Sequence, residues 1–165
     1  MRFAWPKARA ASAQRVNRRE RLLAAADFYF AINATFRFIL QNYGEEALHR
    51  YWRALGAEYY APLADRFRTG GLDEVARYWT AFFAAEPGGD VSVAREKDEV
   101  ILTVRECPAI RWLRLHNREI CPGYCQHCRH VSTAIAENAG MRFTLTGGGG
   151  TCEQTFSLRD GESPA

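Results

Sequence analysis

The chain has 165 residues, of which 47% are hydrophobic and 13% aromatic, so it can bury the core of one globular domain and is not intrinsically disordered. The formal net charge is only +3, which argues against a fold with an extended basic surface for nucleic acid. No stretch approaches the roughly 20 apolar residues of a membrane span, and no apolar run of signal-peptide length precedes the basic residues at 15–19. We therefore expect a cytoplasmic protein with neither nucleic acid nor a membrane as its partner.

The charge pattern divides the chain into three parts. Six basic residues precede the first acidic residue, Glu20. They are Arg2, Lys7, Arg9, Arg15, Arg18 and Arg19. Such a block of like charge is typical of a solvated, flexible segment. We expect a basic leader over residues 1–19, a single α+β domain over 20–160 and a short tail over 161–165.

Helical periodicity covers the first half of the domain. Apolar residues predict one long helix over 20–43, which ends at Gly44, and an amphipathic helix over 45–68. "TGG" at 69–71 breaks the pattern. A third helix follows and ends at "PGG", residues 87–89.

The apolar period changes to two residues after position 90. "DVSVARE" and "EVILTVRE" predict one β-hairpin, and "MRFTLT" and "TCEQTFSL" on either side of "GGGG" predict a second. Between the hairpins, "CPAIRWLRLHNREI" and "CPGYCQHCRHVSTAIAENAG" predict a helix or a pair of helices. The predicted fold is α+β: three N-terminal helices, then hairpin, helix or helix pair, and hairpin, with a four-stranded antiparallel sheet.

Cysteine is absent from the first 106 residues and crowded into the remainder. The five positions are Cys107, Cys121, Cys125, Cys128 and Cys152. In the cytoplasm such thiols bind metals or react more often than they form disulfides, and an odd number excludes complete pairing.

Two of these cysteines are followed by proline. Cys107-Pro108 and Cys121-Pro122 are each expected to open a helix, because proline suits the first helical turn. A thiol there lies near the helix N-terminus, where free N–H groups and the dipole favour the thiolate and lower its pKa. For Cys121 two interpretations stay open, an activated thiol and a plain helix boundary.

The spacing of the thiols limits how they can share a metal ion. Cys121, Cys125 and Cys128 form one stripe of a regular helix, whose ends lie about 10 Å apart along the axis. Zinc needs its sulfur ligands roughly 3.8 Å apart. Cys125 and Cys128 can share zinc, and Cys107 and Cys152 would then complete a site of four thiolates.

Other metal arrangements stay open. An irregular turn around Gly123 would bring the three clustered thiols together around an iron–sulfur cluster. The spacing C-x3-C-x2-C also matches radical S-adenosylmethionine enzymes, but 165 residues in this element order cannot form their barrel. His130, two residues after Cys128, is an alternative ligand.

Strict alternation in the last strand places Cys152 on the apolar face with Phe156. Its neighbour Glu153 points the other way under the same alternation. Cys152 is therefore expected to face the core, and Glu153 keeps an acid nearby for proton transfer.

Three motifs resemble the L-2-amino-thiazoline-4-carboxylic acid hydrolase family: "RECP", "YCQHC" and "GGTCEQTF". The resemblance implies functional thiols at Cys107, Cys125 and Cys152. Cys128 stands where the family pattern has an acid, which adds a soft ligand and removes a carboxylate base. The layout of helices followed by a hairpin is also similar to 4-vinyl reductase type small-molecule-binding domains, whose members often bind zinc.

We therefore expect a hydrolase-like enzyme that acts on a small cyclic or amidine-type C–N or C–S substrate. Cys121, Cys152 and Glu153 are the expected catalytic residues, and zinc or, alternatively, an iron–sulfur cluster is the expected cofactor. The alternative function is a small-molecule-binding or sensory module with a structural metal. A small molecule is the expected partner in both cases, and a homodimer stays open.

Overall fold

Two long helices precede the sheet, and each is interrupted at a glycine with positive φ. The computed structural model describes residues 18–86 and 88–159, with side chains described from residue 27 onward. Helix α1 (Arg18–Ala54) changes direction at Gly44, where φ is 82°, and helix α2 (Ala61–Ala85) is interrupted at Gly71, where φ is 61°. Both predicted breaks are confirmed. The predicted leader lies outside the described residues apart from its last two positions, and so does the tail.

The three-helix division expected here is not confirmed, because a π-helical turn joins α1 to α2. This turn, Leu55–Tyr59, interrupts the helix predicted over 45–68. Within it, Gly56 is buried, and a Cβ atom there would lie 2.4 Å from the carbonyl oxygen of Val131 and 2.7 Å from the Ala134 Cβ. Only glycine permits this close approach to the neighbouring helix.

The two predicted hairpins are confirmed and form one antiparallel sheet. Strands β1 (Asp90–Arg95) and β2 (Glu99–Glu106) form the first, and β3 (Met141–Gly148) and β4 (Thr151–Leu158) form the second. The strand order is β1-β2-β4-β3, so that β2 pairs with β4 at the centre. In this register Val104 lies opposite Cys152.

Two shorter helices lie between the hairpins. Helix α3 (Pro108–Leu115) begins directly after Cys107, as predicted, and ends before Asn117, whose φ is 50°. Helix α4 (Gln126–Asn138) begins five residues later than the Cys121 start that was predicted. Both helices are thus confirmed, but only the first has a Cys-Pro pair at its N-terminus.

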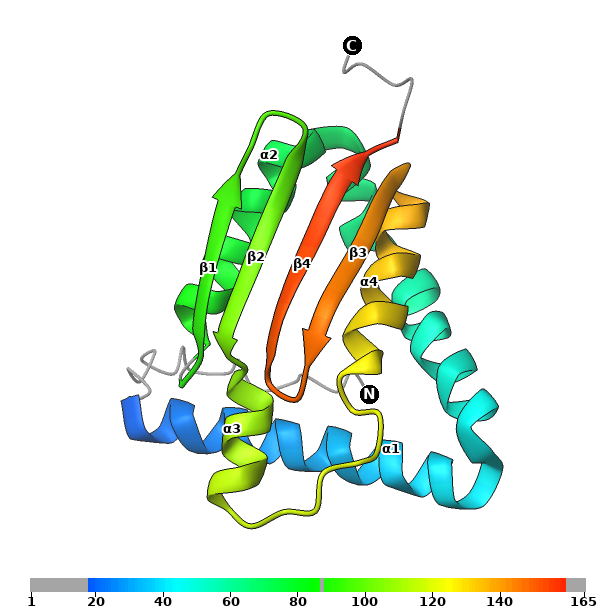
Figure 1. Ribbon diagram of the computed structural model, residues 1–165, viewed down its shortest axis with the longest axis vertical. Coiled ribbons are helices and arrows are strands. Elements are labelled where there is room, and N and C mark those ends of the chain that lie inside the picture. The colour runs from blue at the N-terminus through cyan, green and yellow to red at the C-terminus, as the bar shows by residue number, and fades with distance from the viewer. Residues whose placement is uncertain (1–17, 87, 160–165) are drawn as a thin grey trace, which may run out of the picture.

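The helices cover one face of the sheet (Figure 1). Helices α2 and α4 pack on the strands from behind, the second part of α1 runs alongside α4, and the first part of α1 crosses the sheet end near α3. Alternate residues Val100, Leu102, Val104 and Phe156 are buried against these helices. Among the described residues, no helix combines the length and the apolar composition that a membrane span requires.

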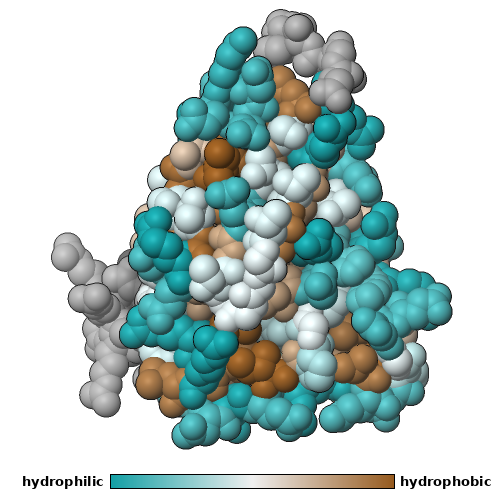
Figure 2. Space-filling model, in the orientation of Figure 1, coloured by the Kyte–Doolittle hydropathy of each residue, from teal (hydrophilic) through white to brown (hydrophobic). Residues whose placement is uncertain are grey.

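The other face of the sheet is turned toward the viewer in Figures 1 and 2, and no helix of the described part covers its centre. Apart from the half-exposed Ile101, it carries mainly small hydroxyl-bearing and charged residues, as alternation requires. They include Thr103, Thr144, Thr155, Ser157, Arg142 and Glu153. The functional groups of the cysteine cluster are therefore to be sought on the covered face.

Candidate functional site

A cavity of about 390 Å³ lies between the helices and the covered face of the sheet. Aromatic residues from the two long helices, from the turn between them and from the start of α4 form a large part of its wall. They are Phe28, Tyr29, Phe36, Tyr51, Tyr59, Tyr60, Tyr78, Trp79, Phe82, Phe83 and Tyr124. The remaining wall comes from the strand ends and the starts of α3 and α4. This volume and this apolar lining are typical of a small-molecule site.

Three of the aromatic lining residues are exposed to solvent. Phe28 is 61% exposed, Tyr59 is 73% exposed and Phe82 is 41% exposed. They come from α1, the π-helical turn and α2, so they mark where the cavity wall reaches the surface.

Four of the five cysteines line this cavity. Cys107 precedes α3, Cys125 and Cys128 lie at the start of α4, and Cys152 lies in β4. These residues are far apart in the sequence, and the crossing of α3, α4 and the sheet brings them to one wall. They are the same four that the sequence analysis groups as metal ligands.

Cys121 and Glu153 lie elsewhere. Cys121 is 2% exposed and belongs to the hydrophobic core, where its thiol lies 3.4 Å from the carbonyl oxygen of Pro122. Glu153 is exposed on the uncovered face of the sheet, on the side that alternation predicts. Neither residue lines the cavity, so their expected catalytic roles stay predictions without support from the geometry.

Burial governs the acid–base state of the cavity thiols. It raises the pKa of both Cys107 and Cys128 to about 11. The backbone N–H groups of Ile110 and Ala109 oppose this at Cys107, as expected at a helix N-terminus, but desolvation outweighs them. Some surface of Cys128 stays accessible only because it lines the cavity, so the thiol is still removed from bulk water.

The lowered pKa expected for the two Cys-Pro thiols is therefore wrong. Burial also raises the pKa of Cys121, and the positive charge of Arg37 offsets this only in part. All three of these thiols are neutral near pH 7.

Two polar side chains contact the cavity thiols. His127 Nδ1 lies 3.5 Å from the Cys128 sulfur, and burial lowers the pKa of His127 to about 4, so the imidazole is neutral at pH 7. The buried Gln154 donates a weak hydrogen bond from Nε2 to the Cys152 sulfur at 3.5 Å. The wall around Cys128 and Cys152 is thus polar, and its histidine is uncharged at pH 7.

Two further groups give the cavity hydrogen-bonding capacity. The hydroxyl of Tyr29 is hydrogen-bonded to Glu86, and burial with this carboxylate raises the pKa of Tyr29. Trp79 has a buried Nε1–H without a hydrogen-bond partner among the described residues. A buried donor of this kind is satisfied when a bound molecule supplies an acceptor.

The thiols do not form a ready metal site. Within residues 18–86 and 88–159, no group of three or more His, Cys, Asp and Glu side chains is arranged to hold a metal ion. Binding of zinc or an iron–sulfur cluster would require the thiols to move together and lose their protons. Both cofactors stay predictions.

The aromatic wall was open as one of two possibilities in the sequence. The aromatic residues of the first helix fit a core and a pocket equally well, because both place apolar residues at helical spacing. The spacing of His127 and Gln154 from other residues does not by itself predict that they belong to a site. The buried position of Gln154 in an apolar alternation, two residues after Cys152, is the one hint that the sequence contained.

Comparison with known proteins assigns the chain to no group: no protein-family model matches it, and no curated protein is significantly similar to it. The class of protein is therefore defined by the fold and the cavity, an α+β domain with an aromatic cavity and a thiol wall. The resemblance to L-2-amino-thiazoline-4-carboxylic acid hydrolases rests on the three short motifs alone.

Proposed function

We propose that the protein binds an apolar, ring-containing small molecule in the aromatic cavity, with the four thiols as one wall. The observation that carries this proposal is the cavity of about 390 Å³, which is lined by eleven Phe, Tyr and Trp residues and four cysteines. Planar apolar molecules gain most from such a wall, because aromatic side chains bury large areas and stack with them.

The lining chemistry supports binding more than hydrolysis. Of the described residues that line the cavity, none is acidic, and the histidine beside Cys128 is a weak base. Hydrolysis needs a base whose pKa lies near the working pH and a thiol that ionises readily. Uncharged thiols instead contribute polarizable contacts to a bound ring.

A cysteine hydrolase of the expected type is the second candidate function, and the contact between Cys128 and His127 favours it. In that case His127 would take the thiol proton while Cys128 adds to the electrophilic carbon. The ring C–N or C–S bond would then break as the leaving nitrogen or sulfur takes that proton from His127, and water would release the product and restore the thiol. Turnover of a cyclic C–N or C–S substrate that disappears in Cys128→Ser would support this function. If the catalytic residues were instead Cys121, Cys152 and Glu153, turnover should disappear in Cys121→Ser.

Ligand binding is tested by filling the cavity. Ser132 is buried in α4 and lines the cavity, so Ser132→Phe should occupy the space of a bound ring. Ser157→Phe is the matched control, because Ser157 lies on the uncovered sheet face. The probe is 2-naphthamide, an uncharged two-ring molecule, and binding is followed by calorimetry and by tryptophan fluorescence.

We expect 2-naphthamide to bind the wild-type chain and Ser157→Phe equally, and to bind Ser132→Phe at least tenfold more weakly. Circular dichroism and the melting temperature verify that both variants fold. Absence of binding to the folded wild-type chain, or equal binding to both variants, would overturn the proposal.

The metal is tested separately by elemental analysis and an absorption spectrum of protein purified without oxygen. One zinc per chain that is lost in Cys125→Ser would show that the thiols rearrange into a four-thiolate site. Brown colour and several irons per chain would support the cluster. Retention of 2-naphthamide binding after metal removal would show that the cavity binds the probe without zinc and without an iron–sulfur cluster.

A further inference from the structure

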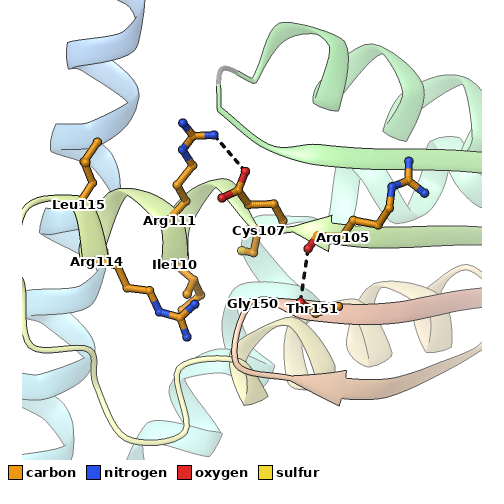
Figure 3. Close-up of a pocket in the computed structure, with 9 residues that line it drawn as sticks. Arg105, Cys107, Ile110, Arg111, Arg114, Leu115, Gly150 and Thr151 are labelled. Atoms are coloured by element: carbon orange, nitrogen blue, oxygen red, sulfur yellow. Dashed lines mark hydrogen bonds and ion pairs between the residues drawn. The ribbon is translucent and has the colours of Figure 1, made fainter.

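The aromatic cavity has no charged lining, although charged side chains lie close by. Among the described residues that line it, none is Asp, Glu, Lys or Arg. A second hollow, of about 530 Å³, shares Cys107 with the cavity wall and is lined by Arg105, Arg111, Arg114 and Glu106. Figure 3 shows Arg111 extending from α3 to its ion pair with Glu106, whose length is 2.9 Å. The lining charges are thus confined to this second hollow, and three of the four cavity thiols line only the aromatic cavity.

Two of the cavity thiols form a pair on one turn of α4. Cys125 precedes the helix with helical backbone angles of its own (φ −68°, ψ −17°), and Cys128 lies in the first turn. Side chains three residues apart on a helix are neighbours, with about 5–6 Å between their Cβ atoms. Both thiols line the cavity. The pair is therefore a dithiol that a molecule bound in the cavity can reach.

Aromatic rings lie beside this dithiol. Tyr124 directly precedes Cys125. His127 directly precedes Cys128, and the ring centroids of Tyr124 and His127 are 5.7 Å apart. Phe36 of α1 packs against both rings, with centroid distances of 5.5 Å to Tyr124 and 5.3 Å to His127. All three rings line the cavity. An aromatic ligand joined to both sulfurs would therefore hold its ring among other rings, where burial and stacking stabilise it.

The charge left after binding decides which kind of thiol ligand suits this cavity. Zinc on four thiolates carries a net negative charge, which is costly to bury where no described lining residue is Lys or Arg. Burial raises the pKa of Cys128 to about 11, so this thiol keeps its proton near pH 7. A ligand atom that exchanges hydroxyl groups for protonated thiols leaves no charge behind. Trivalent arsenic does this, because each As–OH and S–H pair gives one As–S bond and one water molecule.

We infer that the ring-containing molecule of the cavity is an aryl compound of trivalent arsenic, and that Cys125 and Cys128 bind its arsenic atom together. For an arylarsonous acid, two As–OH and two S–H bonds break and two As–S bonds form. Both thiol protons leave with the hydroxyl groups as water, and arsenic stays trivalent. The second As–S bond closes within one helical turn, so the pair holds arsenic more tightly than separate thiols do. The inference rests on the proposed function, since it names the chemical class of the cavity ligand.

The test uses phenylarsonous acid on the full chain in excess glutathione, a monothiol that removes arsenic from single protein thiols but not from a chelating pair. Cys125→Ser and Cys128→Ser each break the pair. Cys121→Ser is the matched control, because Cys121 lies in the core and does not line the cavity. Elemental analysis and intact mass measure the arsenic per chain, and 2-naphthamide binding verifies that the cavity of each variant is intact.

A second measurement asks whether the ring lies in the cavity. Methylarsonous acid has the same arsenic chemistry without a ring. Its affinity relative to phenylarsonous acid is measured for the protein and for dithiothreitol, a free dithiol that has no cavity. Ser132→Phe fills the cavity without changing either thiol of the pair.

We expect the wild-type chain and Cys121→Ser to retain one arsenic per chain. Each of the two α4 variants should bind arsenic about tenfold more weakly and still bind 2-naphthamide. The wild-type chain should prefer phenyl over methyl about tenfold more strongly than dithiothreitol does, because the ring is buried. Ser132→Phe should abolish this additional preference.

The two proposals fail in different ways. Unchanged arsenic binding in both α4 variants, or a preference for phenyl no greater than that of dithiothreitol, would overturn the arsenic inference. If 2-naphthamide were still excluded by Ser132→Phe, the cavity function would stand. Binding of 2-naphthamide that is insensitive to Ser132→Phe would overturn the cavity function itself.

Discussion

Cys107-Pro108 and Cys121-Pro122 are the same dipeptide in two regions of the molecule, and the chain folds differently around each. At the first, Pro108 is buried in the first turn of α3, and the thiol lines the aromatic cavity. At the second, a tight turn follows in which Gly123 has a φ of +72°, and α4 begins only at Gln126. The second thiol lies in the core and lines no cavity.

Tertiary hydrogen bonds account for this difference. The Cys121 backbone N–H donates to Oδ1 of the buried Asn33 in α1, and Asn33 Nδ2 donates to the carbonyl oxygen of Glu119, both at 2.9 Å. An ion pair of 2.6 Å between Arg37 and Glu119 holds the same segment. The chain around Cys121 is thus anchored to α1, whereas Cys107 is anchored to the sheet end at Gly150. A Cys-Pro pair permits a helix start, and the partners of its backbone decide whether one forms.

The largest expected effect comes from removing the anchor of Cys121. Asn33→Ala should lower the free energy of unfolding by about 3 kcal/mol, because it leaves the buried Cys121 N–H and the partly buried Glu119 carbonyl without partners. Asn42→Ala is the control: Asn42 is exposed, donates to the Phe38 carbonyl oxygen within α1, and should cost less than about 0.5 kcal/mol. Urea denaturation measures both, and equal losses would contradict the anchoring role.

Much of the fold could be predicted from the sequence, because it depends on patterns among residues that are close together in the chain. The glycines at 44 and 71 and the two hairpins follow from turn chemistry and a change of period. The late start of α4 could not be predicted, since it depends on Asn33, which lies 88 residues from Cys121. The grouping of four thiols was predicted from composition, but the cavity they line depends on how the helices pack.

The next largest effect should be in the pH dependence of stability, which should distinguish the cavity wall near Cys107 from the core around Cys121. The pKa of His127 in the cavity wall is about 4, below its ordinary value of 6.5, so the unfolded chain takes up a proton first. Stability should fall as the pH drops from about 6.5 to about 4, by roughly 2 kcal/mol. In His127→Phe this decrease in stability at acid pH should disappear. A variant in which Cys121 is replaced should still show it. Thermal melts between pH 4 and 7 measure the difference.

On the alkaline side both regions should act in the same direction, because burial raises the pKa of the Cys121 thiol as well as those of Cys107 and Cys128. The folded chain holds the protons of Cys107 and Cys128 up to a pKa of about 11, whereas the unfolded chain releases them from about 9.0. Stability should therefore fall as the pH rises from about 9 to about 11. An unchanged melting temperature over that range would show that these thiols are not buried.

Replacing each Cys-Pro thiol by serine should give effects of different kinds. Cys121→Ser places a hydroxyl in the core and should cost about 1–2 kcal/mol of stability without changing the affinity for 2-naphthamide. Cys107→Ser should cost less stability, because its side chain borders the cavity, but should weaken 2-naphthamide a few fold through the more polar wall. Urea denaturation and calorimetry separate the two results. The reverse pattern would mean that Cys121, not Cys107, contacts the bound ring.

The smallest expected effect lies in the prolines themselves. Pro108 is buried in the first turn of α3, so Pro108→Ala loses both packing and a preset φ, and should cost about 1 kcal/mol. Pro122 is exposed in the turn before α4, and Pro122→Ala should change stability by less than about 0.5 kcal/mol. Paired urea titrations detect this difference. Equal losses would mean that both prolines act mainly by restricting the unfolded chain, and that the helix start at Cys107 owes little to Pro108.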